Sequence, residues 1–183
     1  GTIPAKSVRP YGPGQRRGLY RASFNPIGYR KAPDDHNKLI VDEETAWIIK
    51  RIFEYANAGM GSHKIASTLR KEQVPCPSWW QHTRGEKDYS QRFSDPANKY
   101  EWSHTVILGI IGNPVYLGHT IMCKHETVFK VGILKKTPDA DRIRVDNTHE
   151  PLVSQEMFDN ANAKILSRKR EDTSGNVSIF SGL

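Results

Sequence analysis

The chain has 183 residues, 37% of them hydrophobic, and a formal net charge of +7 at pH 7. This length is enough to bury one core, and no apolar run approaches the ~20 residues that a membrane span needs. The two cysteines, Cys76 and Cys123, exclude a disulfide framework, so we expect a reduced, cytoplasmic setting.

The positive charge is concentrated near the N-terminus. Residues 1–38 contain eight Lys and Arg against two Asp, a surplus of six. Residues 9–21 combine four arginines with glycine, proline and tyrosine, which favours neither a core nor a long helix. We therefore predict an extended basic arm over 1–25. Such arginines suit phosphate and minor-groove contacts, although many charged segments are only solvated linkers. The candidate contacts are Arg9, Arg16, Arg17 and Arg21, with Arg30 and Lys31 in the turn-rich entry that follows.

A first helix is predicted over 43–58. Asp42 is its expected N-cap, Glu43 and Glu44 suit the positive first turn, and Gly59 ends it. Its apolar residues recur with helical spacing. The expected buried stripe consists of Ala46, Ile49, Ile52, Phe53 and Ala56, with Trp47 and Tyr55 at its borders.

Two shorter helices follow, over 62–72 and 103–112, each with a serine as its expected N-cap (Ser62 and Ser103). The first has Ile65, Ala66 and Leu69 on one face. The second has a predicted stripe of Val106, Ile107, Ile110 and Ile111, and an outer face of His104, Thr105, Leu108 and Gly109. A packed helix followed by one with a slim polar face is typical of helix-turn-helix DNA readers. Spacing alone favours ordinary bundle packing.

A polar stretch of nearly thirty residues separates these two helices. A loop of this length is usually functional or disordered. Its Arg84, Lys87, Arg92 and Lys99 indicate either a flexible clamp on the DNA backbone or plain disorder. Trp102, just before the helix cap, is expected to act as a hydrophobic staple, and Trp79 and Trp80 to close the core from the loop side.

Beyond Pro114 the pattern changes to strands. Residues 115–124, 126–133 and 142–147 are rich in β-formers, and residues 137–141 predict a turn between two antiparallel strands. Lys135, Lys136 and Arg142 flank this turn and are candidate phosphate contacts, although edge lysines also serve to block aggregation. A last helix is predicted over 155–170, capped by Ser154.

Five segments in this order resemble the recombinase domain of large serine recombinases, the class of phage integrases and serine transposases. They are Gly28-Tyr29-Arg30, residues 39–77, Trp102, residues 107–119 (ILGIIGNPVYLGH) and residues 147–161 (NTHEPLVSQEMFDNA). The match runs from about Pro26 to Phe180, with a poorer fit over 81–99. Residues 179–183 are similar to the lead-in to the zinc ribbon that follows this domain in the family.

The resemblance implies an α+β fold, a helix-turn-helix-like bundle with a small antiparallel sheet and a C-terminal helix. It implies three parts: the arm (1–25), a DNA-binding recombinase domain (26–175) and the start of a linker to a zinc ribbon (176–183). The expected partners are double-stranded DNA and other recombinase subunits, with no membrane. We expect Ser103, His104 and Thr105 to read the major groove.

The resemblance also places the catalytic serine in a separate N-terminal domain, so we expect no nucleophile and no cofactor in this chain, and zinc only in the downstream domain. Ser62, Ser103 and Ser154 are explained as helix caps. His119, Cys123 and His125 are too scattered for a convincing metal site. Two alternatives stay open: a free-standing transcriptional regulator of the winged-helix kind, with residues 137–141 in its wing, and a protein-docking module.

Overall fold

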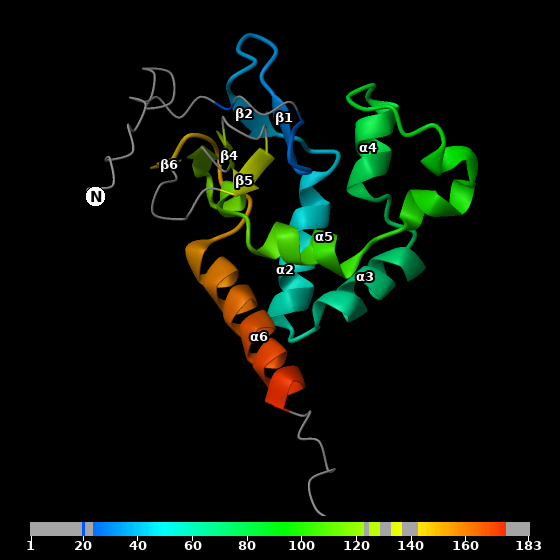
Figure 1. The fold of residues 1–183 in the computed structure, drawn as a ribbon, viewed down its shortest axis with the longest axis vertical. Coiled ribbons are helices and arrows are strands. Elements are labelled where there is room, and N and C mark those ends of the chain that lie inside the picture. The colour runs from blue at the N-terminus through cyan, green and yellow to red at the C-terminus, as the bar shows by residue number, and fades with distance from the viewer. Residues whose placement is uncertain (1–19, 21–23, 123–124, 129–132, 137–142, 175–183) are drawn as a thin grey trace, which may run out of the picture.

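The computed structural model describes residues 20, 24–122, 125–128, 133–136 and 143–174. In these residues a small hairpin, β1 (Tyr29–Lys31) and β2 (Leu39–Val41), precedes a group of helices, and short strands separate the last helix from the others (Figure 1). The helices are α2 (Ala46–Asn57), α3 (Ser62–Lys71), α4 (Pro77–Thr83), α5 (His104–Ile111) and α6 (Gln155–Ser174). The predicted α+β class is confirmed.

Helix α2 is the centre of the core. Its expected stripe is buried, and Ile48, Ile49, Ile52 and Phe53 are each 0% exposed. The helix begins at Ala46 and not at residue 43, because Thr45 occupies the N-cap and Asp42 acts one turn earlier. There the Asp42 carboxylate accepts a hydrogen bond from Thr45 Oγ1 at 2.5 Å. Glu43 and Glu44 therefore precede the helix and do not lie in its first turn. Gly59, with φ +87°, follows its end as predicted.

Helices α3 and α5 pack against each other and on α2 (Figure 1). In α3 the predicted face of Ile65, Ala66 and Leu69 is buried. The expected cap was wrong, because Ser62 is the first helical residue and Gly61, which has no capping side chain, is the N-cap. In α5 the cap is confirmed, since Ser103 Oγ accepts a hydrogen bond from Val106 N.

The stretch between α3 and α5 is not a featureless loop. It contains α4 and two 3₁₀ turns, η1 (Arg92–Ser94) and η2 (Pro96–Tyr100). Trp79 and Trp80 pack against the core, as predicted. The Trp102 side chain is 2% exposed, and its Nε1 donates to the carbonyl of Val74 at 2.8 Å. These long-range aromatic contacts order a segment whose own sequence has little helical signal.

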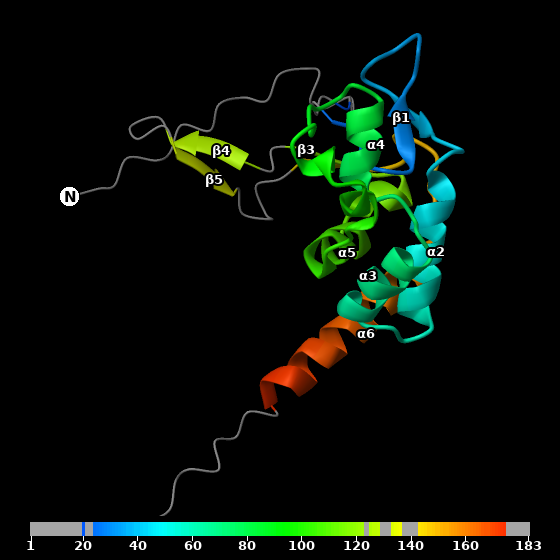
Figure 2. The ribbon, with the colours of Figure 1, turned by 90° about the vertical axis from the view of Figure 1, so that its right-hand side faces the viewer.

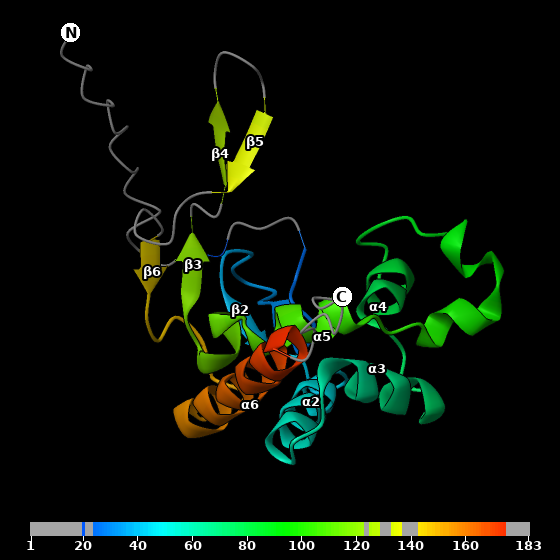
Figure 3. The ribbon, with the colours of Figure 1, turned by 60° about the horizontal axis from the view of Figure 1, so that its bottom comes forward.

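The strands after α5 form two antiparallel pairs, which Figure 3 shows one beyond the other. β3 (Thr120–Met122) pairs with β6 (Ile143–Val145), and β4 (His125–Val128) pairs with β5 (Ile133–Lys136). Residues 115–117, expected to be extended, belong instead to a 3₁₀ turn, η3 (Pro114–Leu117). The predicted turn at 137–141 lies outside the described residues, but β5 and β6 on its two sides do not pair with each other. The chain reverses between β4 and β5, within the segment expected to be one strand.

The last helix, α6, packs against α2 and α5. Its predicted cap is confirmed, because Ser154 Oγ accepts a hydrogen bond from Met157 N at 3.2 Å. Phe158 stacks on Phe53 of α2 with ring centroids 5.8 Å apart. Asn162 Nδ2 donates to the carbonyl of Ile111 at 2.8 Å, which links α6 to the end of α5. No helix in the described part of the chain is long and apolar enough to cross a membrane.

A polar joint connects the strands to the helices. His149 Nε2 lies 2.7 Å from the carbonyl of Val115, so it is the donor there. Burial lowers the pKa of His149, which favours this neutral form. Thr148 N donates to the carbonyl of Gly118 at 2.8 Å, and Tyr29 OH donates to the carbonyl of Glu150 at 2.7 Å. Several residues that carry the family resemblance thus have structural roles.

Gly118 at this joint has φ +82°, and a Cβ there would lie 2.5 Å from the carbonyl oxygen of His149. Gly118→Ala is therefore expected to combine backbone strain with a clash, and to lower the free energy of unfolding by about 3 kcal/mol or more. Gly85→Ala is the matched control, because Gly85 has φ +68° but nothing within 4 Å of the added carbon. In this variant the free energy of unfolding is expected to fall by about 1–2 kcal/mol, from backbone strain alone. Urea unfolding of both variants measures the difference, and equal losses would contradict the proposed close contact.

Candidate nucleic-acid interface

Helix α5 is buried on one side only. Ile107, Ile110 and Ile111 face the core, whereas Thr105, Leu108 and Gly109 are exposed. Val106 was expected in the buried stripe, but 39% of its surface is exposed. The burial follows the i, i+3, i+4 spacing of 107, 110 and 111, which leaves residue 106 at the edge of the outer arc. The outer surface of α5 therefore has no charged side chain.

Gly109 lies in this outer surface without an intramolecular reason to be glycine. It does not have a positive φ, and a Cβ built on it has no atom within 4 Å. Glycine inside a helix costs about 1 kcal/mol relative to alanine. Neither backbone geometry nor packing within the described chain accounts for it. Another surface that approaches α5 closely would account for it.

The three predicted groove-reading residues meet at the start of α5. Ser103 Oγ lies 2.8 Å from Thr105 Oγ1. The His104 ring stacks on the ring of His63, at the start of α3, with centroids 4.0 Å apart and an interplanar angle of 17°. The structure thus places Ser103, His104 and Thr105 together, but the Ser103 and Thr105 hydroxyls lie against each other and the His104 ring lies on His63.

Cationic side chains lie on both sides of this helix start. One groove between α3 and α5 is lined by His63, Ser67, Arg70 and His104. Arg70 Nη2 donates to the carbonyl of Trp102 at 3.3 Å, and its Nε lies 3.3 Å from a carboxylate oxygen of Glu101. Arg70 is not among the contacts predicted from the sequence, since only the pairing of α3 with α5 brings it beside Ser103.

A second depression, between α5 and the segment that contains α4 and η1, includes Arg92. This exposed residue of η1 shares the lining with Gln81, Tyr89, Ser103 and Val106. The Arg92 guanidinium donates only a long hydrogen bond, 3.4 Å, to the carbonyl of Glu101. Arg92 therefore stays a candidate contact, and the fold places it beside α5.

Arg84, by contrast, is held within the protein. Its guanidinium lies 2.8 Å from a carboxylate oxygen of Asp42 and 2.8 Å from one of Glu44, and it covers the ring of Trp80. Asp42 is only 5% exposed. Burial raises the pKa of Asp42, but hydrogen bonds from Thr45 and Arg84 outweigh it and hold that pKa below its ordinary value. Arg84 thus ties α4 to the start of α2 and is not free for an outside partner.

The remaining candidates are dispersed. Arg30 and Lys31 belong to the hairpin, which joins the start of α2 through a hydrogen bond from Gly28 N to Thr45 Oγ1 at 3.0 Å. Figures 1 and 2 show this hairpin at one end of the molecule, away from α5. Lys135 and Lys136 are in β5, and Figure 2 shows β4–β5 projecting on the same side of α2 as α5. Five arginines lie outside the described residues: Arg9, Arg16, Arg17, Arg21 and Arg142.

The histidine considered as a metal ligand has a structural partner. His119 is 9% exposed, and its Nδ1 lies 3.1 Å from a carboxylate oxygen of Asp146 at the root of the β3–β6 pair. Cys123 lies outside the described residues, and His125 is in β4. Within the described residues no group of three or more His, Cys, Asp or Glu side chains is placed to hold a metal ion.

Comparison with known proteins gives one family. The family model described as Recombinase matches residues 43–168. Similar solved structures include "Crystal Structure of a LSR-DNA Complex", at 18% identity and a TM-score of 0.49, where the match covers 92% of this chain and 39% of that chain. Another is "Sequence Requirements of the Listeria innocua prophage attP site", at 16% identity and a TM-score of 0.42, covering 91% of this chain and 53% of that chain. This chain therefore spans about two fifths of the first of these proteins and about half of the second.

Removal of the Arg84 guanidinium leaves the buried Asp42 carboxylate without its ion pair. Arg84→Ala is therefore expected to lower the free energy of unfolding by about 2 kcal/mol at pH 7. Because the pKa of Asp42 is held below its ordinary 3.8, this loss is full above that pH and disappears as the pH falls through the lowered value. Urea unfolding at several pH values measures it. Arg51→Ala is the control, since Arg51 and Glu72 pair at an exposed site, and a loss below about 1 kcal/mol is expected. Equal losses of unfolding free energy in the two variants would contradict a stabilising role of the Arg84–Asp42 ion pair.

Proposed function

Since this chain belongs to the Recombinase family, we propose that it is the DNA-binding part of a large serine recombinase. In this proposal it grips half of an attachment site in double-stranded DNA, and a separate catalytic domain cuts and rejoins the strands. Other subunits of the recombinase are its further partners. The observation that carries the proposal is the outer surface of α5, which is exposed, uncharged and centred on an otherwise unexplained glycine.

The arrangement of helices supports this role for α5. In helix-turn-helix proteins the second helix of the pair enters the major groove with its first residues toward the bases. Here α3 packs on α5, and the exposed residues of α5 begin at its N-terminal cap, Ser103. An uncharged helix with Gly109 on its outer side can come close to base edges without desolvating a charge.

Affinity is expected to come from phosphate contacts around α5. Arg92 and Arg70 flank the start of the helix, and Lys135 and Lys136 are on the projecting ribbon β4–β5. We include the arm arginines, Arg30, Lys31 and Arg142 as backbone contacts on the ground of charge alone. Arg84 is left out, since Asp42 and Glu44 occupy it. Binding through phosphates weakens steeply with salt.

Strand cleavage is assigned to another domain, partly because the two serines that cap helices in the described residues are otherwise engaged. Ser103 and Ser154 accept hydrogen bonds from backbone amides of Val106 and Met157 as caps. Neither is paired with a general base in the described part of the chain. A nucleophilic serine needs such activation.

A second candidate is a free-standing transcriptional regulator of the winged-helix kind. It is favoured by one observation: a β-ribbon follows α5, in the place where a winged-helix protein has its wing. The two candidates share the DNA-binding surface and differ in what precedes it. A serine-nuclease segment encoded upstream in the full gene supports the recombinase, and its absence there supports the regulator.

Gly109→Ala gives the sharpest test of the proposed surface because two readouts are expected to move in opposite directions. The added methyl group has open space and improves helix propensity by about 1 kcal/mol, which raises the melting temperature by about 2–4 °C. The same group separates α5 from the groove, so the affinity for cognate duplex is expected to fall about tenfold, equivalent to about 1.4 kcal/mol. Thermal unfolding and fluorescence anisotropy measure the two effects.

The control is Asn160→Ala, an exposed position in α6. It also replaces a weaker helix former by alanine, so stability should rise with no change in DNA affinity. If the Gly109→Ala protein is more stable and binds DNA as tightly as the parent, α5 is not part of the DNA interface.

Alanine variants of Arg92 and Arg84 are expected to differ in effect: the first weakens DNA binding and the second lowers stability. Arg92→Ala should leave the melting temperature nearly unchanged and reduce the slope of log affinity against log salt by about one, the amount for one lost phosphate contact. Arg84→Ala removes the same charge 8 residues earlier, and there the slope should stay as in the parent while stability falls. Titrations of duplex DNA at four or more salt concentrations give both slopes. An unchanged slope for Arg92→Ala would exclude Arg92 from the DNA contact.

A further inference from the structure

The outer surface of α5 lacks the side chains that read purines. Its exposed residues include Ser103, Thr105, Val106, Leu108 and Gly109. Guanine is read mainly by arginine or lysine, and adenine by asparagine or glutamine, through paired hydrogen bonds in the major groove. None of these four residue types is present among residues 103–112. Recognition of a base by two parallel hydrogen bonds is therefore not available to the side chains of this helix.

The hydroxyl groups at the start of α5 are already bonded. Ser103 Oγ accepts from the amide of Val106 at 3.3 Å and lies 2.8 Å from Thr105 Oγ1. The Ser103 hydroxyl is thus used for capping, and the hydroxyl of Thr105 is directed to Ser103. Thr105 thus presents its methyl group beside a hydroxyl that already has a partner.

Two large apolar side chains complete this surface. Val106 is 39% exposed and Leu108 is 40% exposed, which places both among the most exposed large hydrophobic residues in the described part of the chain. The distinctive apolar feature of a base edge in the major groove is the C5-methyl group of thymine. Valine, leucine and threonine methyl groups match it, and they match no other base.

We propose that α5 recognises thymine through its C5-methyl groups, by apolar contact with Thr105, Val106 and Leu108, and that Gly109 permits the close approach. This inference rests on the proposed function, in which α5 enters the major groove. It adds the chemical class of base that the helix selects, and it predicts A·T pairs with thymine toward α5 at the positions opposite these residues.

Charge favours DNA over a protein as the occupant of this surface. Arg70 and Arg92 flank it, and Lys64 and Lys71 are exposed on the neighbouring α3. Among the described residues that line the two depressions beside the helix start, Glu101 is the one acid, and it is paired with Arg70. An apolar strip bordered by cations fits a groove whose floor has methyl groups and whose walls are phosphates.

The test starts from the 183-residue chain and a randomised duplex library. Repeated binding and amplification yields the preferred duplex, and each thymine in it is then replaced singly by deoxyuridine, which removes the methyl group and keeps the base pairing. At the contacted positions the dissociation constant is expected to rise about fourfold per methyl group, the value for about 0.8 kcal/mol. In a second series these pairs become C·G, and 5-methylcytosine in place of cytosine is expected to recover about the same factor.

Variants of the helix assign the effect to its side chains. In Val106→Ala and Leu108→Ala, both at exposed positions, the thymine-to-uracil ratio at one or more positions should fall from about fourfold toward one. Leu166→Ala, also an exposed leucine, in α6, is the matched control and should keep the full ratio.

The outcomes are distinguishable. Selection of a duplex whose affinity is unaffected by every uracil replacement overturns the methyl inference and leaves the proposed function standing. Uracil effects that persist unchanged in both α5 variants also overturn it, since another part of the chain then reads the methyl groups. Failure to enrich or bind any duplex at low salt overturns the proposed function together with this inference, and would leave a protein as the occupant of the surface.

Discussion

The burial of α2 determines the rest of the structure. Ile48, Ile49, Ile52 and Phe53 are fully enclosed, so α2 needs partners on several sides, and α3, α5 and α6 supply them. Helix α5 has only eight residues, and three of them, Ile107, Ile110 and Ile111, are used for this burial. The direction of its outer surface is therefore fixed by the core and not by any interaction of its own. If α5 enters a groove of DNA as proposed, its outer surface is already fixed before binding, which reduces the entropy lost on binding.

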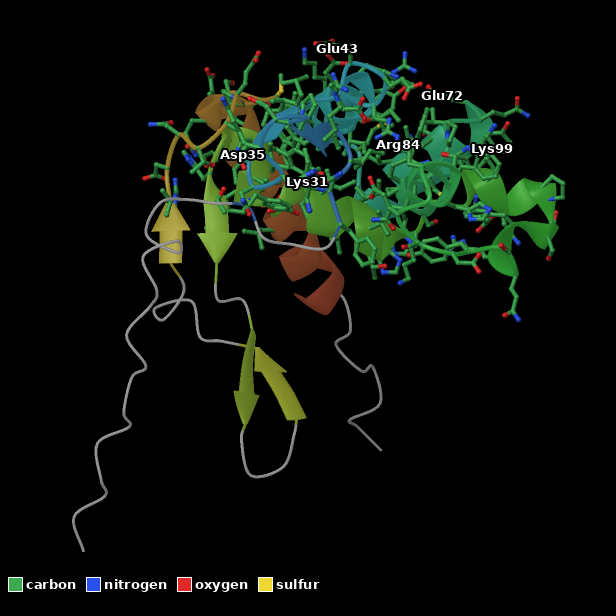
Figure 4. The ribbon with its side chains drawn as sticks, turned by 90° about the horizontal axis from the view of Figure 1, so that it is seen from above. Lys31, Asp35, Glu43, Glu72, Arg84 and Lys99 are labelled. Carbon is green, nitrogen blue, oxygen red and sulfur yellow. The ribbon has the colours of Figure 1, made fainter. Side chains whose placement is uncertain are left out.

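Two polar connections attach the remaining parts to that core. Between α3 and α5, Arg84 joins Asp42 and Glu44 across some forty residues of sequence, and so ties the end of α4 to the start of α2. Below the strands, the side chains of His149 and Thr148 donate hydrogen bonds to the backbone carbonyls of Val115 and Gly118, just before β3. Asp42 is buried at the first connection, while Glu43 and Glu72 lie on the edge of the molecule opposite to β4–β5 (Figure 4). The side from which α5 and the ribbon project is thus clear of those two acids.

Local sequence signals predicted the helices well and the other segments poorly, for a physical reason. Apolar spacing predicted α2, α3, α5 and α6, and serine caps marked the starts of α5 and α6, because these signals are contained within each helix. Helix α4 depends on Trp79, Trp80 and the Arg84 ion pairs, whose partners are distant in sequence. The pairing of the strands was predicted wrongly because turn propensity at 137–141 does not specify which strands pair. The candidate site shows the same limit: Arg84 and Arg92 look alike in the sequence, and only their neighbours separate a structural tether from an exposed cation.

In the proposed function, the division between base recognition by α5 and phosphate binding by other segments follows from the chemistry of α5. A helix without charge cannot supply the salt-dependent part of DNA affinity, so that part must come from cations outside it, such as Arg70, Arg92 and the basic arm. Nor do methyl contacts suffice for full specificity. Three such contacts at about 0.8 kcal/mol each give about 2–3 kcal/mol, whereas specific and non-specific binding typically differ by about 4–10 kcal/mol. The remaining discrimination must come from DNA shape, from the arm or ribbon, or from other domains of the parent protein. The modest energy of α5 makes it suited to choosing among sites to which the protein is already held by its cations.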